Sequence, residues 1–146
     1  CEPYINGIAM LLGKIRAAGV NNVAIHPGDA RDLFDVLPAA SIDKAFLLYP
    51  DPWPKSRHHR RRFVNPEFLD PLADVMKSGA ILRVATDIKD YVRQTLEQMY
   101  IHPSFEWLAE SPDDWRMPWN DWISTRYEIK AIREERTPHY LTFRRV

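Results

Sequence analysis

The sequence has little cysteine, little glycine and no excess of charge of either sign. Cys1 is its single cysteine, which excludes a disulfide framework and a cysteine-based zinc site. The five glycines form neither GxGxxG nor GxxxxGK[ST], so both of these phosphate-binding turns are absent. The 20 Lys and Arg residues balance 20 Asp and Glu residues. A nucleic-acid partner would therefore have to be held by a local patch of positive charge.

Long apolar runs are also missing. No run approaches the ~18 residues that span a membrane, and no signal peptide is visible, so we expect a protein of the reducing cytoplasm. A chain of 146 residues that is 45% hydrophobic suits one domain with its own core, and we expect a single domain over residues 1–146. The chain starts at Cys1 without an initiator Met, which we interpret as an incomplete N-terminus.

Helical and strand patterns alternate along the chain, which predicts an open, mostly parallel, doubly wound α/β sheet. Gly19 is placed to end the first helix, and Asn65 and Asp87 are placed to cap later ones. The nearly continuous apolar run at 42–49 predicts a strand buried on both faces. The patterns predict helices at 5–18, 30–37, 66–77, 88–100 and 125–135, and strands at 22–26, 42–49, 80–86, 105–109 and 139–145.

An acidic residue stands at or just after the end of most predicted strands. These residues are Glu2, Asp29, Asp51 and Asp87. In open α/β sheets, ligands bind beyond the carboxyl ends of the strands. A carboxylate at the end of the second strand typically accepts both hydroxyls of a ribose, and Glu2 fits this place if one βαβ unit precedes it. The alternative is that Asp merely favours turns and helix caps, but Asp51 lies between two prolines and caps nothing obvious.

The strongest local motif is Asp51-Pro52-Trp53-Pro54-Lys55, followed by a basic run. Prolines stiffen the loop, Trp53 offers an aromatic plane, and the run carries no acidic residue. This combination favours a site for a nucleobase and its phosphates. The alternative is a solvated, charged helix start. The run consists of Arg57, His58, His59, Arg60, Arg61 and Arg62.

A second motif is Thr125-Arg126-Tyr127-Glu128. Its T-x-x-E pattern is a capping box, which explains Thr125 and Glu128 without function. It explains neither Tyr127 nor the basic residues that follow, Lys130, Arg133 and Arg136. We expect the nearby tryptophans to be core or loop anchors. The five histidines show no metal-ligand spacing, so we expect no metal site.

These two motifs, together with Ala85-Thr86-Asp87, resemble the bacterial tRNA (guanine-N7-)-methyltransferases in order and spacing along the whole chain. The resemblance implies a Rossmann-like class I enzyme that transfers a methyl group from S-adenosylmethionine (SAM) to N7 of a guanosine in the tRNA variable loop. The family's first strand and Gly-rich loop are not in this chain.

The resemblance also implies roles for individual residues. Glu2 would bind the SAM ribose, Asp29 would lie by the adenine, and Asp51 would face the methyl donor as the catalytic residue. The substrate-binding positions would be Lys55, Asp87, Thr125, Arg126, Tyr127 and Glu128. The RNA-contacting segment would be Arg57, His58, His59, Arg60, Arg61 and Arg62.

Three other functions compete with this one. The first is a SAM enzyme that acts on a small molecule or a protein and does not need the basic run. The second is an RNA-binding module or non-catalytic subunit on a methyltransferase-like fold. A nucleotide-binding dehydrogenase is disfavoured, because Asp51-Pro-Trp-Pro has no part in hydride transfer. The sequence makes no prediction of oligomeric state.

Overall fold

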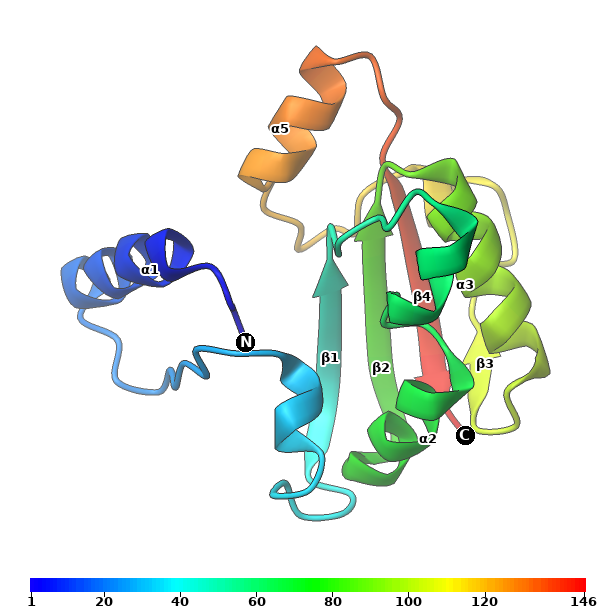
Figure 1. Cartoon of the computed structure of the whole chain (residues 1–146), viewed down its shortest axis with the longest axis horizontal. Helices are drawn as coiled ribbons and strands as arrows, with labels where there is room; N and C mark the ends of the chain where they lie inside the picture. Colours follow the sequence, from blue (N-terminus) through cyan, green and yellow to red (C-terminus); the bar gives the residue numbers. More distant parts are fainter. The chain divides into compact units, whose positions relative to one another are not determined.

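The computed structural model describes residues 1–146, which fall into two compact units, Cys1–Leu37 and Pro38–Val146. The first unit contains helix α1 (Ile5–Ala18) and the short 3₁₀ helix η1 (Ala30–Leu33) (Figure 1). Helix α1 has the predicted bounds. Gly19 ends it in the left-handed conformation, with φ 65°, and donates its backbone N–H to Arg16. The second predicted helix is limited to η1, shorter than expected.

The strand predicted at 22–26 is absent. Its one backbone hydrogen bond runs from the Glu2 N–H to the His26 carbonyl, at 3.1 Å. A strand is stabilised by a ladder of such bonds to a neighbouring strand, and no strand of this unit lies beside these residues. The prediction was therefore wrong, because the β-like composition alone supplies no partner.

The second unit is built on a four-stranded sheet in the order β1-β2-β4-β3 (Figure 1). Strand β4 pairs antiparallel with both β2 and β3, whereas β1 and β2 pair in parallel. Three strands therefore run in one direction and β4 runs against them, which confirms the α/β class with mostly parallel strands. The strands are β1 (Ile42–Leu48), β2 (Met76–Thr86), β3 (Phe105–Trp107) and β4 (His139–Arg145).

Helices fill the connections between these strands. Helices α2 and α3 pack against β2, and α3 also contacts β3. No helix of the structure is both long and apolar enough to cross a membrane. The helices of this unit are η2 (Ser56–Arg61), α2 (Pro66–Val75), α3 (Lys89–Ile101), α4 (Asp113–Arg116) and α5 (Arg126–Arg133).

The two faces of the sheet differ. Leu82, Val84, Leu141 and Phe143 are buried on the face that forms the core. On the other face Phe46, which is opposite Arg83 of β2, is 51% exposed. The expectation that β1 is buried on both faces was therefore wrong. An apolar run shows that a strand can be buried, but β1 lies at the edge of this sheet.

Several element ends differ from the prediction. Helix α2 gives way directly to β2 at Met76, and Gly79 adopts φ 81° within a register shift of that strand. Asn65 does not cap α2 with its side chain. Asp87 does not cap α3 either. Helix α3 has no side-chain cap, and the hydroxyl of Thr86 accepts the N–H of Ile88, the residue before the helix, at 3.2 Å.

Candidate functional site

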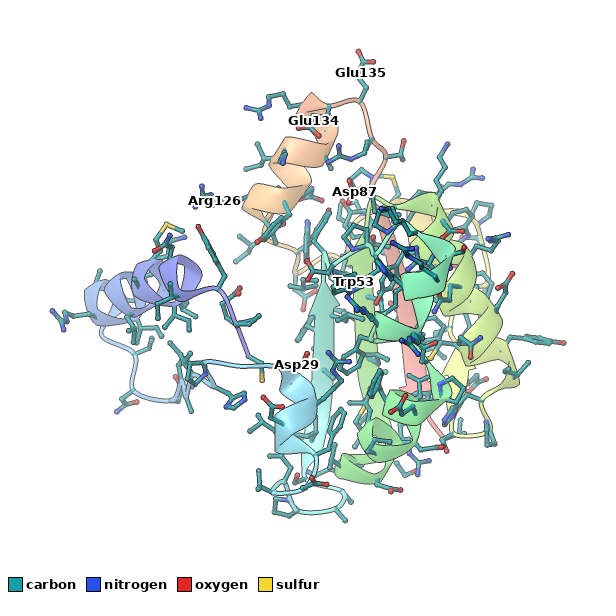
Figure 2. The ribbon with its side chains drawn as sticks, viewed as in Figure 1. Asp29, Trp53, Asp87, Arg126, Glu134 and Glu135 are labelled. Carbon is teal, nitrogen blue, oxygen red and sulfur yellow. The ribbon has the colours of Figure 1, made fainter.

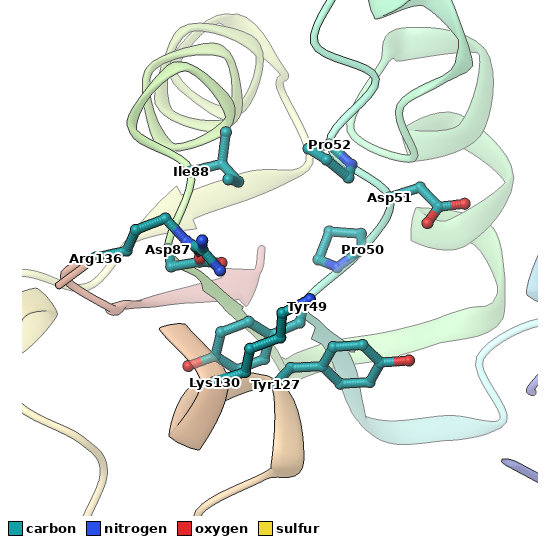
Figure 3. A pocket seen from close by; sticks show the side chains of 9 residues that line it. All are labelled: Tyr49, Pro50, Asp51, Pro52, Asp87, Ile88, Tyr127, Lys130 and Arg136. Carbon is teal, nitrogen blue, oxygen red and sulfur yellow. Dashed lines mark hydrogen bonds and ion pairs between the residues drawn. The ribbon is translucent and has the colours of Figure 1, made fainter. Parts of the chain in front are cut away.

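The carboxyl ends of β1 and β2 border a cavity of about 170 Å³ (Figure 3). This is where ligands bind in open α/β sheets. The cavity brings together three residues that the motifs singled out: Asp51, Asp87 and Tyr127. It is lined by Tyr49, Pro50, Asp51, Pro52, Asp87, Ile88, Tyr127, Lys130 and Arg136.

Tyr49, Lys130 and Arg136 line the cavity without a predicted site role. Lys130 and Arg136 carried a signal, because they belong to the basic residues that the capping box left unexplained. Tyr49 carried no such signal, because in the sequence it is simply the last residue of an apolar run that predicts a strand.

The loop after β1 is rigid. Tyr49 and Trp53 both adopt positive φ, at 50° and 41°, which is strained for bulky residues. The N–H of Tyr49 donates to the carbonyl of Ala85 at 2.7 Å, which ties the end of β1 to β2. Prolines fix φ on either side of Asp51. The backbone alone therefore places Asp51, whose exposed carboxylate accepts no hydrogen bond and points away from Asp87 (Figure 3).

Asp87 is held differently. Its side chain is only 9% exposed, and its Oδ2 accepts a hydrogen bond from Nε of Arg136. Arg136 also pairs with Glu134. These two carboxylates raise the pKa of Arg136, Asp87 contributing most. Asp87 therefore stands as one half of an ion pair at the wall of the cavity.

Two tyrosines form another part of the cavity. The rings of Tyr49 and Tyr127 stack with centroids 6.2 Å apart and an interplanar angle of 16°. Burial raises the pKa of Tyr49, and the negative charges of Glu128 and Asp87 raise it further, so this hydroxyl stays neutral. Tyr127 is 57% exposed, which leaves much of its ring accessible to a planar ligand.

Helix α5 is fixed by a buried carboxylate. The hydroxyl of Thr125 accepts the N–H of Glu128 at 3.1 Å, as the capping box predicts. The carboxylate of Glu128 turns instead to Trp122 and Tyr140, and its residue is only 3% exposed. Burial opposes ionisation of Glu128, but the hydrogen bonds from Ser124, Tyr140 and Trp122 lower its pKa overall. Thr125 and Glu128 thus hold α5 in place.

Trp119 and Trp122 are anchors, as expected. Trp119 donates its indole N–H to the hydroxyl of Thr142 on β4, at 2.8 Å. Its ring meets those of Trp122 and Tyr140 edge to face. The cluster fastens the segment before α5 to the sheet.

The basic run forms the 3₁₀ helix η2 and its flanks, and most of its cations are exposed. The guanidinium of Arg61 lies 4.8 Å from the ring centroid of Trp53, and His58 meets the same ring edge-on at 5.9 Å. This cluster places the Trp53 ring and several cations next to the Asp51 loop. The exposed cations are Lys55, Arg57, Arg60 and Arg61.

Arg62 differs from the rest of the run, since it is only 1% exposed. Its guanidinium donates to the Pro52 carbonyl at 2.8 Å and to the side chains of Asp90 and Gln94, both at 2.8 Å. It also lies 5.1 Å from the ring centroid of Tyr91. Arg62, which was predicted to contact RNA, is thus turned inward, and its hydrogen bonds join the loop after β1 to helix α3.

Of the three residues predicted to bind SAM, Glu2 and Asp29 lie in the first unit and Asp51 lies in the second. Oε1 of Glu2 accepts the N–H of Tyr4 at 2.8 Å, while Oε2 makes no hydrogen bond. A Cβ at Gly7 would come within 3.3 Å of the Glu2 side chain, so the absence of a side chain there makes room for this carboxylate. A carboxylate with one open oxygen suits a ribose hydroxyl.

Asp29 is more fully engaged than Glu2. It caps η1 by accepting the N–H of Arg31 at 3.0 Å, and it also pairs with the Arg31 guanidinium. The hydrogen bond from the Arg31 side chain is the main cause of the lowered pKa of Asp29. No group of three or more His, Cys, Asp or Glu side chains comes together in either unit in a way that suits a metal ion.

Comparisons with known proteins show the family of this chain. The model of a family described as "Putative methyltransferase" matches residues 1–141. The chain is 77% identical over 145 residues to a tRNA (guanine-N(7)-)-methyltransferase of Ruegeria pomeroyi, covering 99% of this chain and 61% of that protein. It is 75% identical to an enzyme of the same name from Roseobacter denitrificans, covering 97% of this chain and 60% of that protein. The chain thus spans about three fifths of the length of these curated relatives.

A solved structure shows the same fold. A crystal structure of a SAM-dependent O-methyltransferase from Thermotoga maritima superimposes with a TM-score of 0.50 at 17% identity. It covers 92% of this chain and 44% of that protein. At this identity the likeness concerns the fold, which agrees with the predicted Rossmann-like methyltransferase class.

Proposed function

This chain belongs to the methyltransferase family whose model covers residues 1–141, and we propose that the full-length protein methylates N7 of a guanosine in the tRNA variable loop. The reaction takes place in the cytoplasm, with SAM as methyl donor. The observation that carries the proposal is the cavity lined by Asp51 and Asp87, at the loop that leads into the exposed cations of η2. The names of the relatives with 75–77% identity support the same reaction.

The residues of the first unit suit the methyl donor. SAM, when bound, supplies a methyl group on a sulfonium sulfur, which leaves as a neutral thioether. Glu2 has one carboxylate oxygen open for a ribose hydroxyl. The guanidinium of Arg31 holds the carboxylate of Asp29 at the start of η1. Asp29 is the residue that we assign to the adenine of SAM.

Methyl transfer to guanine N7 requires no proton transfer by the protein. Guanine N7 has an in-plane lone pair and carries no proton, so no strong base is needed. The residues must instead align the base and stabilise the positive charge that develops on the purine. Asp51 and Asp87 supply negative charge, and their oxygens suit the N1–H and N2–H₂ donors of guanine. The exposed face of Tyr127 offers a stacking surface.

The cations of η2 are assigned to the tRNA backbone. Phosphate contacts position a nucleic acid without reading its bases. Lys55, Arg57, Arg60 and Arg61 are exposed and suited to this task, whereas Arg62 is not. The aromatic plane of Trp53 beside Arg61 extends the same surface.

The decisive experiment uses the full-length protein, labelled SAM and an unmodified tRNA transcript. Aniline cleavage maps N7-methylguanosine, and we expect a single cut in the variable loop. A transcript with 7-deazaguanosine in place of guanosine is the matched control, since it lacks N7 and should accept no methyl group. Retention of tRNA without transfer would instead support an RNA-binding module. Transfer to a protein or small molecule, but not to tRNA, would support the other SAM enzyme.

A second experiment tests the tRNA surface. The double substitution Arg57→Glu and Arg60→Glu should weaken tRNA binding and reduce the slope of log K against log salt by roughly 0.7–0.9 for each phosphate that the protein no longer neutralises. Arg144→Glu, a charge reversal on β4, is the control and should leave the slope unchanged. Equal slopes for the double variant and the wild type would remove η2 from the RNA interface.

A further inference from the structure

Arg136 is the partner that holds Asp87 in the cavity wall. Its Nε donates to Oδ2 of Asp87, and Oδ1 accepts no hydrogen bond. The Asp87 side chain is nearly buried, and both residues line the cavity (Figure 3). One carboxylate oxygen is thus fixed by the protein and the other is left for a ligand.

The backbone after α5 explains why Arg136 reaches this place. The N–H of Arg136 donates to the Ala131 carbonyl at 2.9 Å, and the N–H of Glu135 donates to the Ile132 carbonyl at 3.0 Å. This pair of hydrogen bonds is a Schellman motif, whose left-handed position is taken by Glu135 with φ 58°.

A left-handed conformation is strained for glutamate and persists only where the surrounding contacts enforce it. Figure 2 shows Glu134 and Glu135 at the end of α5, with Asp87 at the end of β2. The turn at Glu135 ends the helix and sets the direction of the chain at Arg136.

We propose that Arg136 is a positioning residue for Asp87 and thereby sets the preference of the site for guanine. This inference rests on the proposed function. With Oδ2 bound to Arg136, the carboxylate cannot rotate freely, and Oδ1 is presented to a donor on the base. Guanine offers N1–H and N2–H₂ donors on this edge, whereas adenine offers an unprotonated N1 that a carboxylate repels. A fixed acceptor of this kind discriminates strongly against a base without the matching donor.

The test compares Arg136→Gln, Arg136→Lys and Asp87→Asn in the full-length protein, with tRNA as substrate. Arg136→Gln should lower kcat/KM for tRNA by about tenfold or more, because the acceptor is no longer fixed. The SAM dissociation constant should stay unchanged. Arg136→Lys should restore part of the loss, since it keeps the charge but not the planar fork. Arg133→Gln, an exposed arginine of the same helix, is the matched control and should behave like wild type.

The double variant distinguishes positioning from a general role in stability. If Arg136 acts through Asp87, adding Arg136→Gln to Asp87→Asn should cause little further loss in kcat/KM. Additive losses, or an Arg136→Gln enzyme equal to Arg133→Gln, would overturn the inference. If Arg136→Gln does not fold, Arg136→Lys with and without Asp87→Asn makes the same comparison. Wild-type protein that does not methylate tRNA would instead overturn the proposed function.

Discussion

Asp51 and Asp87 each follow a parallel strand and line the same cavity, yet different forces hold them. Asp51 is exposed and without a side-chain partner, and its position comes from two prolines and two left-handed residues, Tyr49 and Trp53. Asp87 is nearly buried, and an ion pair with Arg136 fixes its carboxylate. Backbone rigidity leaves a carboxylate free to meet a reacting group, whereas an ion pair directs it towards one ligand geometry.

Arg62 connects these two regions. It donates to Pro52 in the loop after β1 and to Asp90 and Gln94 on the helix that follows β2. The two regions are therefore coupled through one buried guanidinium. Substitutions at a few positions test what each region contributes to stability and to activity.

The largest effect is expected from Arg62→Met. The substitution leaves the carbonyl of Pro52 and the side chain of Gln94 without this donor, and it breaks the ion pair with the half-exposed Asp90. We expect a loss of about 3 kcal/mol in the free energy of unfolding, measured by urea denaturation. Arg60→Met, in the same run but exposed, should change it by less than about 0.5 kcal/mol. Equal stability of the two variants would show that Arg62 does not join the loop after β1 to helix α3.

The second prediction concerns Asp51→Asn. Because the side chain is exposed and has no partner, the melting temperature should stay unchanged. We expect kcat to fall by about 100-fold or more, since the negative charge near the developing purinium is lost. Asp87→Asn should lower both kcat and the melting temperature, because it also removes the ionised partner of Arg136. An Asp51→Asn enzyme with near-normal kcat would contradict the assigned role of Asp51.

The third prediction concerns Glu128→Gln. It tests whether the buried carboxylate of Glu128 holds α5 in place. The pKa of Glu128 is lower in the folded protein, so its ionised form stabilises the fold above pH ~4.5, its ordinary pKa. This contribution is lost as the pH falls through the lower, folded-state pKa. At pH 7, Glu128→Gln should cost about 1–3 kcal/mol of unfolding free energy. The difference from wild type should shrink on acidification, and a difference that is independent of pH would count against this account.

The smallest effect is expected from Glu135→Gly. Glycine adopts the left-handed conformation of this position without the steric cost that glutamate has. We expect a gain of about 1 kcal/mol in the free energy of unfolding, with activity retained. Glu134→Gly is the matched control, because φ is −93° there, and glycine should stabilise nothing. A loss of stability in Glu135→Gly would show that the left-handed residue is not strained.

The sequence predicts elements whose signals are local. Helix α1 has both an apolar periodicity and a glycine at its end, and its predicted bounds match the structure. The alternation of β4 likewise predicts its bounds. Residues 22–26 have a similar β-like composition but no neighbouring strand, and no local signal supplies one.

The candidate site shows the same limit. Asp51 and Asp87 are recognisable because acids at strand ends form a pattern. The buried position of Arg62 is not recognisable from the sequence, because its neighbours in the run are also arginines and are exposed. Its burial depends on Asp90 and Gln94, which are about thirty positions away along the chain. The part played by Arg136 depends on a contact of still longer range, with Asp87 49 positions away along the chain.

The register shift at the start of β2 bears on how the family can vary in length. Between the pairs Ile42–Met76 and Lys44–Ile81, one residue of β1 stands opposite four residues of β2. Lys77, Ser78 and Gly79 are exposed in this stretch, and Gly79 turns with φ 81°. The ladder is already interrupted here, and it resumes in register from Ile81 onward. Insertions and deletions should therefore accumulate in this turn in homologous chains, at the end of the sheet opposite the cavity.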